Sequence, residues 1–409
     1  MIEAAVFGFG TVGSGVVELI DKNQEQICRQ VPEGIHIKYI LDIREFPGSP
    51  YADRVVHDIE QILSDPEIRI CCETMGGKEP AFTFTRRALE KGISVCTSNK
   101  ELVESRGTEL LKVAREHQCS YLFEASVGGG IPILRPLRCC LAQEDITSVM
   151  GILNGTTNYI LTKMENEKAA FEDVLKKAQE MGYAERNPEA DIEGHDCCRK
   201  IAILASLITG KKAAYEEIPC EGITDITQED FEAAAAIGRK VKLLGVASRK
   251  GNGHFAVRTA PFLLTSENPL YAVSDVFNGI LVHGNMVDDL MFYGRGAGKD
   301  ATASAVVSDV IELALTAGHT IPGGWSEEKL NIASGTLQDD EVFRYMIRVD
   351  IRQKEAAISA FGISEEAAEG IWRSEEKQQI AFVTEPMSDQ DFEELADAVS
   401  VLGSIRLIG

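Results

Sequence analysis

Positive charge is scarce in this sequence of 409 residues, which has 41 Lys and Arg against 64 Asp and Glu and a formal net charge of -23. An acidic chain without a tract rich in Lys or Arg is not expected to bind nucleic acid or an anionic membrane. The sequence also lacks an apolar stretch of 18 residues and a charged leader with a cleavage site, so we expect neither membrane insertion nor secretion. A cytoplasmic protein is predicted.

The ten cysteines show no C-x-x-C spacing, which argues against a structural zinc site. Six of them form three adjacent pairs instead, at 71–72, 139–140 and 197–198, within apolar or helical runs. Such positions are typical of free, mostly buried thiols in a reducing compartment.

A glycine-rich turn follows the first apolar stretch, in AVFGFGTVGSGVV at residues 5–17. Gly8, Gly10 and Gly13 have the G-x-G-x-x-G spacing of dinucleotide-binding turns. There the first glycine allows a tight bend, the second lets a pyrophosphate approach the backbone, and the third lets the next helix pack on the strand. The alternative is a glycine turn that binds no nucleotide.

Strand and helix patterns alternate after this turn. We expect a helix to about Gln30, strands at 35–43, 68–77 and 119–126, and a helix followed by a strand within 88–100. This alternation predicts an α/β fold with a doubly wound parallel sheet. The segments ETMGG, TSNK and EASVGGG follow three of these strands, at the carboxyl edge where such sheets bind their ligands.

The pattern changes from about Ile146, where a second domain is expected. It contains a charged helix near 171–181 and strands at 253–264 and 277–283. The segment 288–315 is read as a glycine turn that feeds a helix, which packs back on the first domain. After a linker, strands at 342–351, 378–385 and 404–409 and helices at 354–361 and 389–402 predict a small α/β module.

Asp42 ends the second predicted strand, 29 residues after Gly13, and Arg44 follows it. An acid at this place commonly binds the adenosine ribose and favours NAD, whereas an arginine can bind the 2'-phosphate of NADP. Asp42 as an ordinary turn residue is the third possibility. The cofactor is therefore predicted as NADP or NAD.

Asp196 and Lys200 are four residues apart in a predicted helix and share one of its faces. One interpretation is a surface ion pair. The other is that the lysine, held by the aspartate, gives a proton to the alkoxide that forms when a hydride reaches a carbonyl carbon.

In this context the chain resembles the homoserine dehydrogenase family over about residues 1–315. The segments that carry the resemblance are GFGTVGSGVV (8–17), TSNK (97–100), FEASVGGGIPI (123–133), GILNGTTNYILTKM (151–164), GYAERNPEADIEGHDCCRKIAILA (182–205), FYGRGAG (292–298) and TASAVVSD (302–309).

The resemblance implies reversible reduction of L-aspartate 4-semialdehyde to L-homoserine with NADPH or NADH, in threonine and methionine biosynthesis. Lys200 would be the proton donor and acceptor, Asp196 and Glu185 would bind polar groups of the substrate, and Lys100 would lie between cofactor and substrate. The other implied substrate contacts are Gly155, Thr156 and Tyr183. The implied cofactor contacts are Gly8, Phe9, Gly10, Thr11, Val12, Gly13, Asp42, Arg44, Ser98, Lys100, Gly182 and Gly298. A turn threonine and a packing tyrosine are the plainer readings of Thr156 and Tyr183.

Main-chain carbonyls of Glu124, Val127, Gly129 and Ile131 would hold a monovalent cation, sodium in the family, although an empty glycine loop is the alternative. The chain departs from the family at Asn187, where Asp is usual, at Ser98 in place of Ala, and at Arg295 in place of Pro. Each departure leaves the predicted lysine and carboxylates intact.

The resemblance also sets the predicted domains. A Rossmann-like nucleotide domain comprises residues 1–133 and 295–316, an α+β substrate-binding and dimerisation domain comprises 134–294, a linker comprises 317–340, and a degenerate ACT-like βαββαβ module comprises 341–409. The module reads VDIRQKEAA where the ACT family has an acid followed by Pro-Gly, so effector control is doubtful. A homo-oligomer is implied by the resemblance alone.

Two other functions stay open at this point. One is a related NAD(P)-dependent dehydrogenase for another small amino-acid aldehyde, which would not need Glu185, Asp196 and Lys200 together. The other is a nucleotide-binding regulator without turnover, which would be expected to show a decayed active site.

Overall fold

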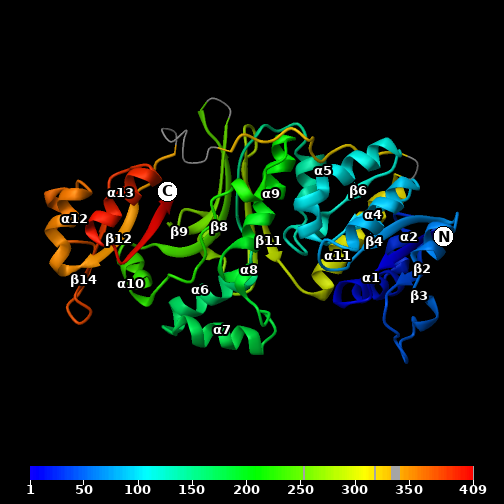
Figure 1. The fold of residues 1–409 in the computed structure, drawn as a ribbon, viewed down its shortest axis with the longest axis horizontal. Helices are drawn as coiled ribbons and strands as arrows, with labels where there is room; N and C mark the ends of the chain where they lie inside the picture. Colours follow the sequence, from blue (N-terminus) through cyan, green and yellow to red (C-terminus); the bar gives the residue numbers. More distant parts are fainter. Residues whose placement is uncertain (252–253, 317–318, 333–340, 409) are drawn as a thin grey trace. The chain divides into compact units, whose positions relative to one another are not determined.

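The computed structural model describes residues 1–251, 254–316, 319–332 and 341–408 (Figure 1). The chain divides into two compact units, each described by itself. Unit 1 contains Met1–Gln143, Ala202–Ala214 and Gly294–Leu330, and unit 2 contains Glu144–Ile201, Tyr215–Tyr293 and Asn331–Gly409. No helix in the described ranges combines the length and the apolar character that a membrane crossing requires.

A six-stranded sheet forms the centre of unit 1. Its order is β3-β2-β1-β4-β5-β6, which is that of the dinucleotide-binding fold. The strands are β1 (Ile2–Phe7), β2 (Ile35–Leu41), β3 (Val55–Val56), β4 (Ile68–Glu73), β5 (Ser94–Thr97) and β6 (Tyr121–Leu122). All neighbouring strands are parallel, so the predicted doubly wound parallel sheet is confirmed.

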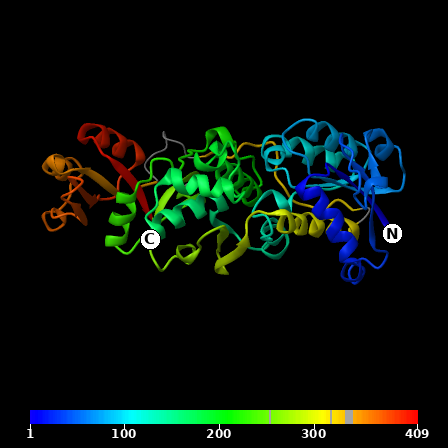
Figure 2. The ribbon, with the colours of Figure 1, turned by 90° about the horizontal axis from the view of Figure 1, so that it is seen from below.

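Amphipathic helices cover this sheet. They are α1 (Thr11–Lys22), α2 (Gln24–Cys28), α3 (Ile59–Leu63), α4 (Ala81–Glu90), α5 (Lys100–Glu116) and α11 (Lys299–Leu315). Helix α11 returns to this unit from late in the chain, as expected, and Figure 2 shows it in yellow beside the blue α1. Val306 and Val310 of α11 share one buried cluster with Val16 of α1 and Ile37 of β2.

Unit 2 is built on a nine-stranded mixed sheet, ordered β11-β10-β7-β8-β9-β15-β12-β14-β13. The strands are β7 (Ile146–Ile152), β8 (Lys240–Arg249), β9 (Phe255–Leu264), β10 (Phe277–Gly284), β11 (Asp288–Arg295), β12 (Tyr345–Asp350), β13 (Trp372–Ser374), β14 (Gln379–Val383) and β15 (Gly403–Ile408). Its helices are α6 (Gly155–Glu167), α7 (Phe171–Glu180), α8 (Glu189–Ile192), α10 (Gln228–Ala236), α12 (Lys354–Ala360) and α13 (Asp389–Val399); α9 (His195–Thr209) begins in this unit.

The last part of the chain has the element order β12-α12-β13-β14-α13-β15, the predicted βαββαβ pattern. Its strand β15 pairs in parallel with β9, so these four strands continue the sheet of unit 2. A buried ion pair between Arg348 on β12 and Asp230 on α10, at 2.6 Å, joins the module to the rest of the unit. The tail therefore packs on β9 and α10 of unit 2.

Three segments differ from the sequence expectation. The helix to Gln30 is wrong as one element, because it breaks at Asn23, whose φ of -106° and ψ of 21° are not helical. Strands β8 and β11 were not expected. β8 is buried over most of its length and so lacks the alternating pattern of an amphipathic strand. Residues 317–318 and 333–340 of the predicted linker lie outside the described residues, and Trp325 between them is buried against Phe123.

Candidate active site

The glycine loop lies at the carboxyl end of β1, the strand beside which the sheet order reverses. Gly8 has a φ of +92°, and a Cβ at Gly13 would lie 1.9 Å from the carbonyl oxygen of Gly8, so both positions require glycine. A Cβ at Gly10 would meet no described atom within 4 Å, which leaves open space over the loop. Helix α1 has no acidic residue in its first turn, so its N-terminal amides can face an anion. The loop fits a pyrophosphate.

Asp42 and Arg44 form a bidentate pair at the end of β2. Arg44 donates from Nε and Nη2 to the two carboxylate oxygens of Asp42, each at 2.9 Å. The amide of Phe9 also donates to Asp42, at 2.8 Å. The arginine lowers the pKa of Asp42 to about 2. The two cues for cofactor preference are therefore joined in one ion pair.

A cavity of about 400 Å³ extends from the glycine loop to this pair, and its lining includes Gly8, Gly10, Asp42, Arg44 and His57. His57, on the loop after β3, was not predicted. Its ring nitrogens lie 2.6 Å from the carbonyl oxygen of Asp42 and 2.9 Å from Glu45, and the hydrogen bond to that carbonyl is the main cause of its raised pKa. Histidine adds a second cation beside Arg44 when it is protonated.

Glu73 connects two loops at the carboxyl edge of the same sheet. Its fully buried carboxylate accepts hydrogen bonds from the amide of Met75 at 2.7 Å and from the hydroxyl of Thr97 at 2.5 Å. Asn99 spans the same two loops, because its side-chain amide donates to the carbonyl of Gly77 at 2.7 Å. Burial raises the pKa of Glu73 to about 7. Sequence reasoning missed this residue, although an acid at the end of an apolar strand is a usable signal.

The predicted cofactor residues after β5 lie beside Glu73. The amide of Ser98 donates to the carbonyl of Glu73 at 3.3 Å, and Asn99 caps α5, of which Lys100 is the first residue. The TSNK segment is thus the turn between β5 and α5, on the same edge as the glycine loop.

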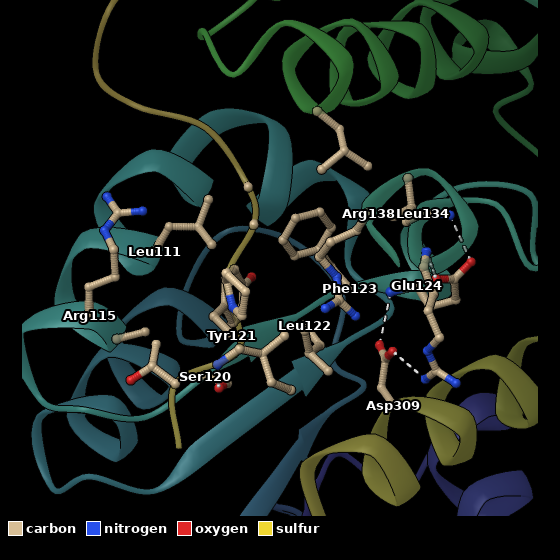
Figure 3. A pocket seen from close by; sticks show the side chains of 18 of the residues that line it. Leu111, Arg115, Ser120, Tyr121, Leu122, Phe123, Glu124, Leu134, Arg138 and Asp309 are labelled. Atoms are coloured by element: carbon tan, nitrogen blue, oxygen red, sulfur yellow. Dashed lines mark hydrogen bonds and ion pairs between the residues drawn. The ribbon is translucent and has the colours of Figure 1, made fainter. Parts of the chain in front are cut away.

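The glycine loop 124–131 was predicted to hold a cation through its carbonyls. In the structure, the side chain of Glu124 is buried and accepts from the amides of Ile133, Leu134 and Arg135 at 2.6, 2.9 and 2.6 Å. Its own amide donates to Asp309 of α11 at 2.9 Å, as Figure 3 shows. Glu124 therefore fixes the loop through its carboxylate, a role that the sequence did not indicate.

Figure 3 shows the cavity beside this network, a space of about 290 Å³ along β6. Its walls are mainly apolar and include Leu111, Leu122, Phe123 and Leu134. The two acids on its wall, Glu124 and Asp309, are engaged by main-chain amides, so this cavity is not the candidate active site.

Lys200 and Asp196 form a buried pair on the first turns of α9. The ammonium of Lys200 donates to Asp196 Oδ2 and to the carbonyl oxygen of Leu153, both at 2.7 Å. Asp196 is 3% exposed and Lys200 is 8% exposed. The surface ion pair is therefore the wrong interpretation, because both groups are withdrawn from water.

Asn154 completes this cluster and was missed by sequence reasoning. Its side-chain amide donates to Asp196 Oδ2 at 2.8 Å and to Asp191 Oδ1 at 2.7 Å, and its oxygen caps α6 by accepting from Thr157 at 2.8 Å. An asparagine just before a helical run is a recognisable cap. Its second role depends on the approach of the turn between β7 and α6 to α9, which the local sequence does not show.

The other predicted substrate residues lie near the start of α6 and in the turn after α7. Gly155 begins α6, and the hydroxyl of Thr156 donates to the carbonyl of Tyr183 at 2.7 Å. Gly182 has a φ of +74°, and Glu185 is exposed, with its carbonyl accepting from Gln179 at 2.9 Å. Thr156 and Tyr183 are thus brought together, whereas in the described part of the chain Glu185 forms no hydrogen bond or ion pair with Lys200.

The site residues divide between the two units. Those of the glycine loop, Asp42, Arg44, Ser98, Lys100 and Gly298 are in unit 1, and those around Lys200, with Gly182, are in unit 2. A glycine loop on a 3-2-1-4-5-6 parallel sheet, in one chain with a buried lysine and aspartate, is the architecture of an NAD(P)-dependent oxidoreductase.

Comparisons with known proteins identify the family. The model of the homoserine dehydrogenase family matches residues 132–311, and that of the homoserine dehydrogenase NAD-binding domain matches residues 8–124. The homoserine dehydrogenase of Bacillus subtilis is 36% identical, over 99% of this chain and 96% of that protein. That of Synechocystis is 41% identical, over 76% of this chain and 73% of that protein. The chain belongs to the homoserine dehydrogenase family.

Solved structures support the same family assignment. The crystal structure of a homoserine dehydrogenase from Thiobacillus denitrificans has a TM-score of 0.89 and 30% identity, and it covers 100% of this chain and 98% of its own. A hyperthermophilic archaeal homoserine dehydrogenase mutant in complex with NADPH has a TM-score of 0.65 and 28% identity, over 77% of this chain and 98% of its own.

Proposed function

We propose that the chain catalyses the reversible reduction of L-aspartate 4-semialdehyde to L-homoserine, with Lys200 as the proton donor and acceptor. The observation that carries this proposal is the buried hydrogen-bonded cluster of Lys200, Asp196 and Asn154 in a chain with a dinucleotide-binding loop. A related dehydrogenase with another substrate would have no evident need for this cluster.

Lys200 is suited to act at the substrate oxygen. An ammonium has three donors, and the described bonds to Asp196 and Leu153 use two of them. The third can donate to the aldehyde oxygen and transfer its proton as the alkoxide forms. In the reverse direction the neutral amine takes the proton from the homoserine hydroxyl.

Asp196 has a second task in this scheme. Its Oδ2 holds both Lys200 and Asn154, so the lysine is fixed in one position before substrate binds. Together with the exposed Glu185, it would attract the ammonium group of the amino-acid substrate. Gly155, Thr156 and Tyr183 would form the wall of the pocket, because the Thr156–Tyr183 bond ties the start of α6 to the turn after α7.

Most of the predicted cofactor contacts belong to unit 1. The amides of residues 8–13 would bind the pyrophosphate, and Asp42 or Arg44 would face the ribose, with Ser98, Lys100, Gly182 and Gly298 as further contacts. When bound, the nicotinamide supplies or accepts the hydride. The NADPH complex of the archaeal relative supports NADP as one of the cofactors, and NAD remains the alternative.

Other features of the proposal rest on family resemblance. They are a sodium ion on the carbonyls of Glu124, Val127, Gly129 and Ile131, an ACT-like identity for residues 341–409, a homo-oligomer and the predicted division into domains. A cytoplasmic location is proposed from the sequence alone. The βαββαβ order of the tail supports the ACT-like identity.

The test is the initial rate of NADPH and NADH oxidation with L-aspartate 4-semialdehyde, for the native chain and for Lys200→Ala. We expect kcat to fall by about 10²- to 10⁴-fold, the usual contribution of a general acid, with unchanged affinity for NADPH in a fluorescence titration. Lys200→Arg controls for loss of the buried cation, and Lys163→Ala, which removes an ion-paired lysine of α6, controls for general effects. Turnover of Lys200→Ala close to that of the native chain would refute the assignment.

A further inference from the structure

Cys220 lies against the start of the helix that carries Lys200. Its Sγ donates to the carbonyl oxygen of Glu193 at 3.4 Å and lies 3.8 Å from His195 Nδ1. The same Nδ1 lies 2.9 Å from the hydroxyl of Tyr215. The thiol therefore has a polar environment with a ring nitrogen in reach, unlike the apolar surroundings of Cys71.

Cys198 is the second thiol at the start of α9. It is fully buried on the first turn of α9, where its amide donates to the carbonyl of Gly194 at 2.9 Å. Cys220 approaches the same turn, because a Cβ at Gly194 would lie 3.3 Å from Cys220 Sγ. Interaction between the two thiols lowers the pKa of Cys220 and raises that of Cys198. Cys220, the thiol whose pKa is lowered, is also the less buried of the two.

Two glycines permit this approach. A Cβ at Gly194 would lie 2.9 Å from the carbonyl oxygen of Glu221 and 3.3 Å from Cys220 Sγ, and Gly194 has a φ of +80°. A Cβ at Gly222 would lie 2.2 Å from the carbonyl oxygen of Ile192. Only glycine at both positions lets the segment 220–222 pack directly on the start of α9.

Solvent reaches one thiol of the pair. Cys220 lines an open cavity of about 810 Å³ in unit 2, together with Glu193, Thr224, Phe392 and Leu402. The lining of the cavity does not include Cys198. A small oxidant can therefore approach Cys220, whereas Cys198 is buried.

We propose that Cys220 and Cys198 are an oxidisable dithiol pair that forms a disulfide with hydrogen peroxide. The thiolate of Cys220 attacks one peroxide oxygen, the O–O bond breaks, and a sulfenic acid forms; the departing hydroxide takes up the proton that the thiol lost and leaves as water. The sulfur of Cys198 then attacks the sulfur of Cys220, the S–O bond breaks, and its proton leaves with the hydroxide as a second water. Two thiols and one peroxide give one disulfide and two waters.

The disulfide has a consequence for the active site that rests on the proposed function. Cys198 lies between Asp196 and Lys200 on α9, so a covalent bond to Cys220 ties the turn that holds both groups to the segment 220–222. We expect kcat to fall at least threefold on oxidation and to recover with dithiothreitol.

The experiment is peptide mapping of the full chain after treatment with hydrogen peroxide and alkylation of the remaining thiols. We expect a cross-linked peptide that joins Cys220 to Cys198, located by fragmentation and lost on reduction. Cys220→Ser should abolish it, whereas Cys139→Ser, at an exposed thiol, should leave it unchanged. Circular dichroism confirms that both variants are folded.

Two results would refute the proposed disulfide between Cys220 and Cys198. One is a Cys220 that stays reduced, or proceeds to sulfinic acid without a cross-link, at a peroxide concentration that oxidises Cys139. The other is a cross-link between the neighbours Cys197 and Cys198. If the expected disulfide forms while kcat is unchanged, only the link to the active site is refuted. Because the map needs no turnover, it stands apart from the test of Lys200.

Discussion

Replacement of Glu73 by glutamine should make unit 1 more stable above neutral pH, although it removes a charge that holds two loops. The carboxyl is fully buried between β4 and β5, and desolvation raises its pKa from 4.5 to about 7. The unfolded chain exposes the same group, with its ordinary pKa. Burial of Glu73 therefore destabilises the folded state most at pH values at which the unfolded glutamate is ionised, because ionisation is unfavourable in the folded state.

The sign and size follow from linkage. A pKa raised in the folded state contributes stability below pH 4.5 that is lost as the pH rises through about 7. The rise of about 2.5 units, at 1.36 kcal/mol per unit, corresponds to about 3 kcal/mol in the free energy of unfolding. Glutamine does not titrate, and its oxygen can still accept from the amide of Met75.

The assay is urea denaturation of the native chain and of Glu73→Gln between pH 5 and pH 8. The difference in free energy of unfolding between the two proteins should change by about 2.5 kcal/mol across this range, in favour of the variant at high pH, because part of the loss already occurs below pH 5. Glu33→Gln, at an exposed position, should give a difference that does not depend on pH. A difference for Glu73→Gln that stays constant from pH 5 to pH 8 would show that the carboxyl is not strongly desolvated.

The remaining predictions concern the cofactor loop. Arg44→Ala should lower kcat/KM for NADPH relative to NADH by about tenfold, because the cation that can face a 2'-phosphate is lost and Asp42 is released; an unchanged ratio in steady-state assays would exclude Arg44 from the ribose site. Gly13→Ala should lower the melting temperature measured by calorimetry, because its Cβ would lie 1.9 Å from the carbonyl oxygen of Gly8. Gly10→Ala should instead leave the melting temperature within about 2 °C and raise KM for the cofactor at least tenfold, since its Cβ meets only open space in the free protein. Equal losses of stability in the two variants would contradict this distinction.

The features that depend on local pattern could be predicted from the sequence. The glycine spacing at Gly8, Gly10 and Gly13, the alternation of strands and helices, and the i,i+4 placement of Asp196 and Lys200 were all readable, because each is set by residues close in the chain. Three strands and two helices of the tail were predicted for the same reason, whereas the full βαββαβ order, with β13, was implied only by the resemblance to ACT modules.

The burial and the contacts of these segments depend on the tertiary structure. The bonds of Lys200 to Leu153 and of Asn154 to Asp196 arise because the turn between β7 and α6 meets α9. Pairing of β15 with β9 joins elements more than 130 residues apart. Glu73 receives its raised pKa from neighbours on β5, and β8 is a strand because other elements cover it, not because its residues alternate. Desolvation and sheet pairing depend on contacts between segments far apart in the chain, so they cannot be predicted from residues near in sequence.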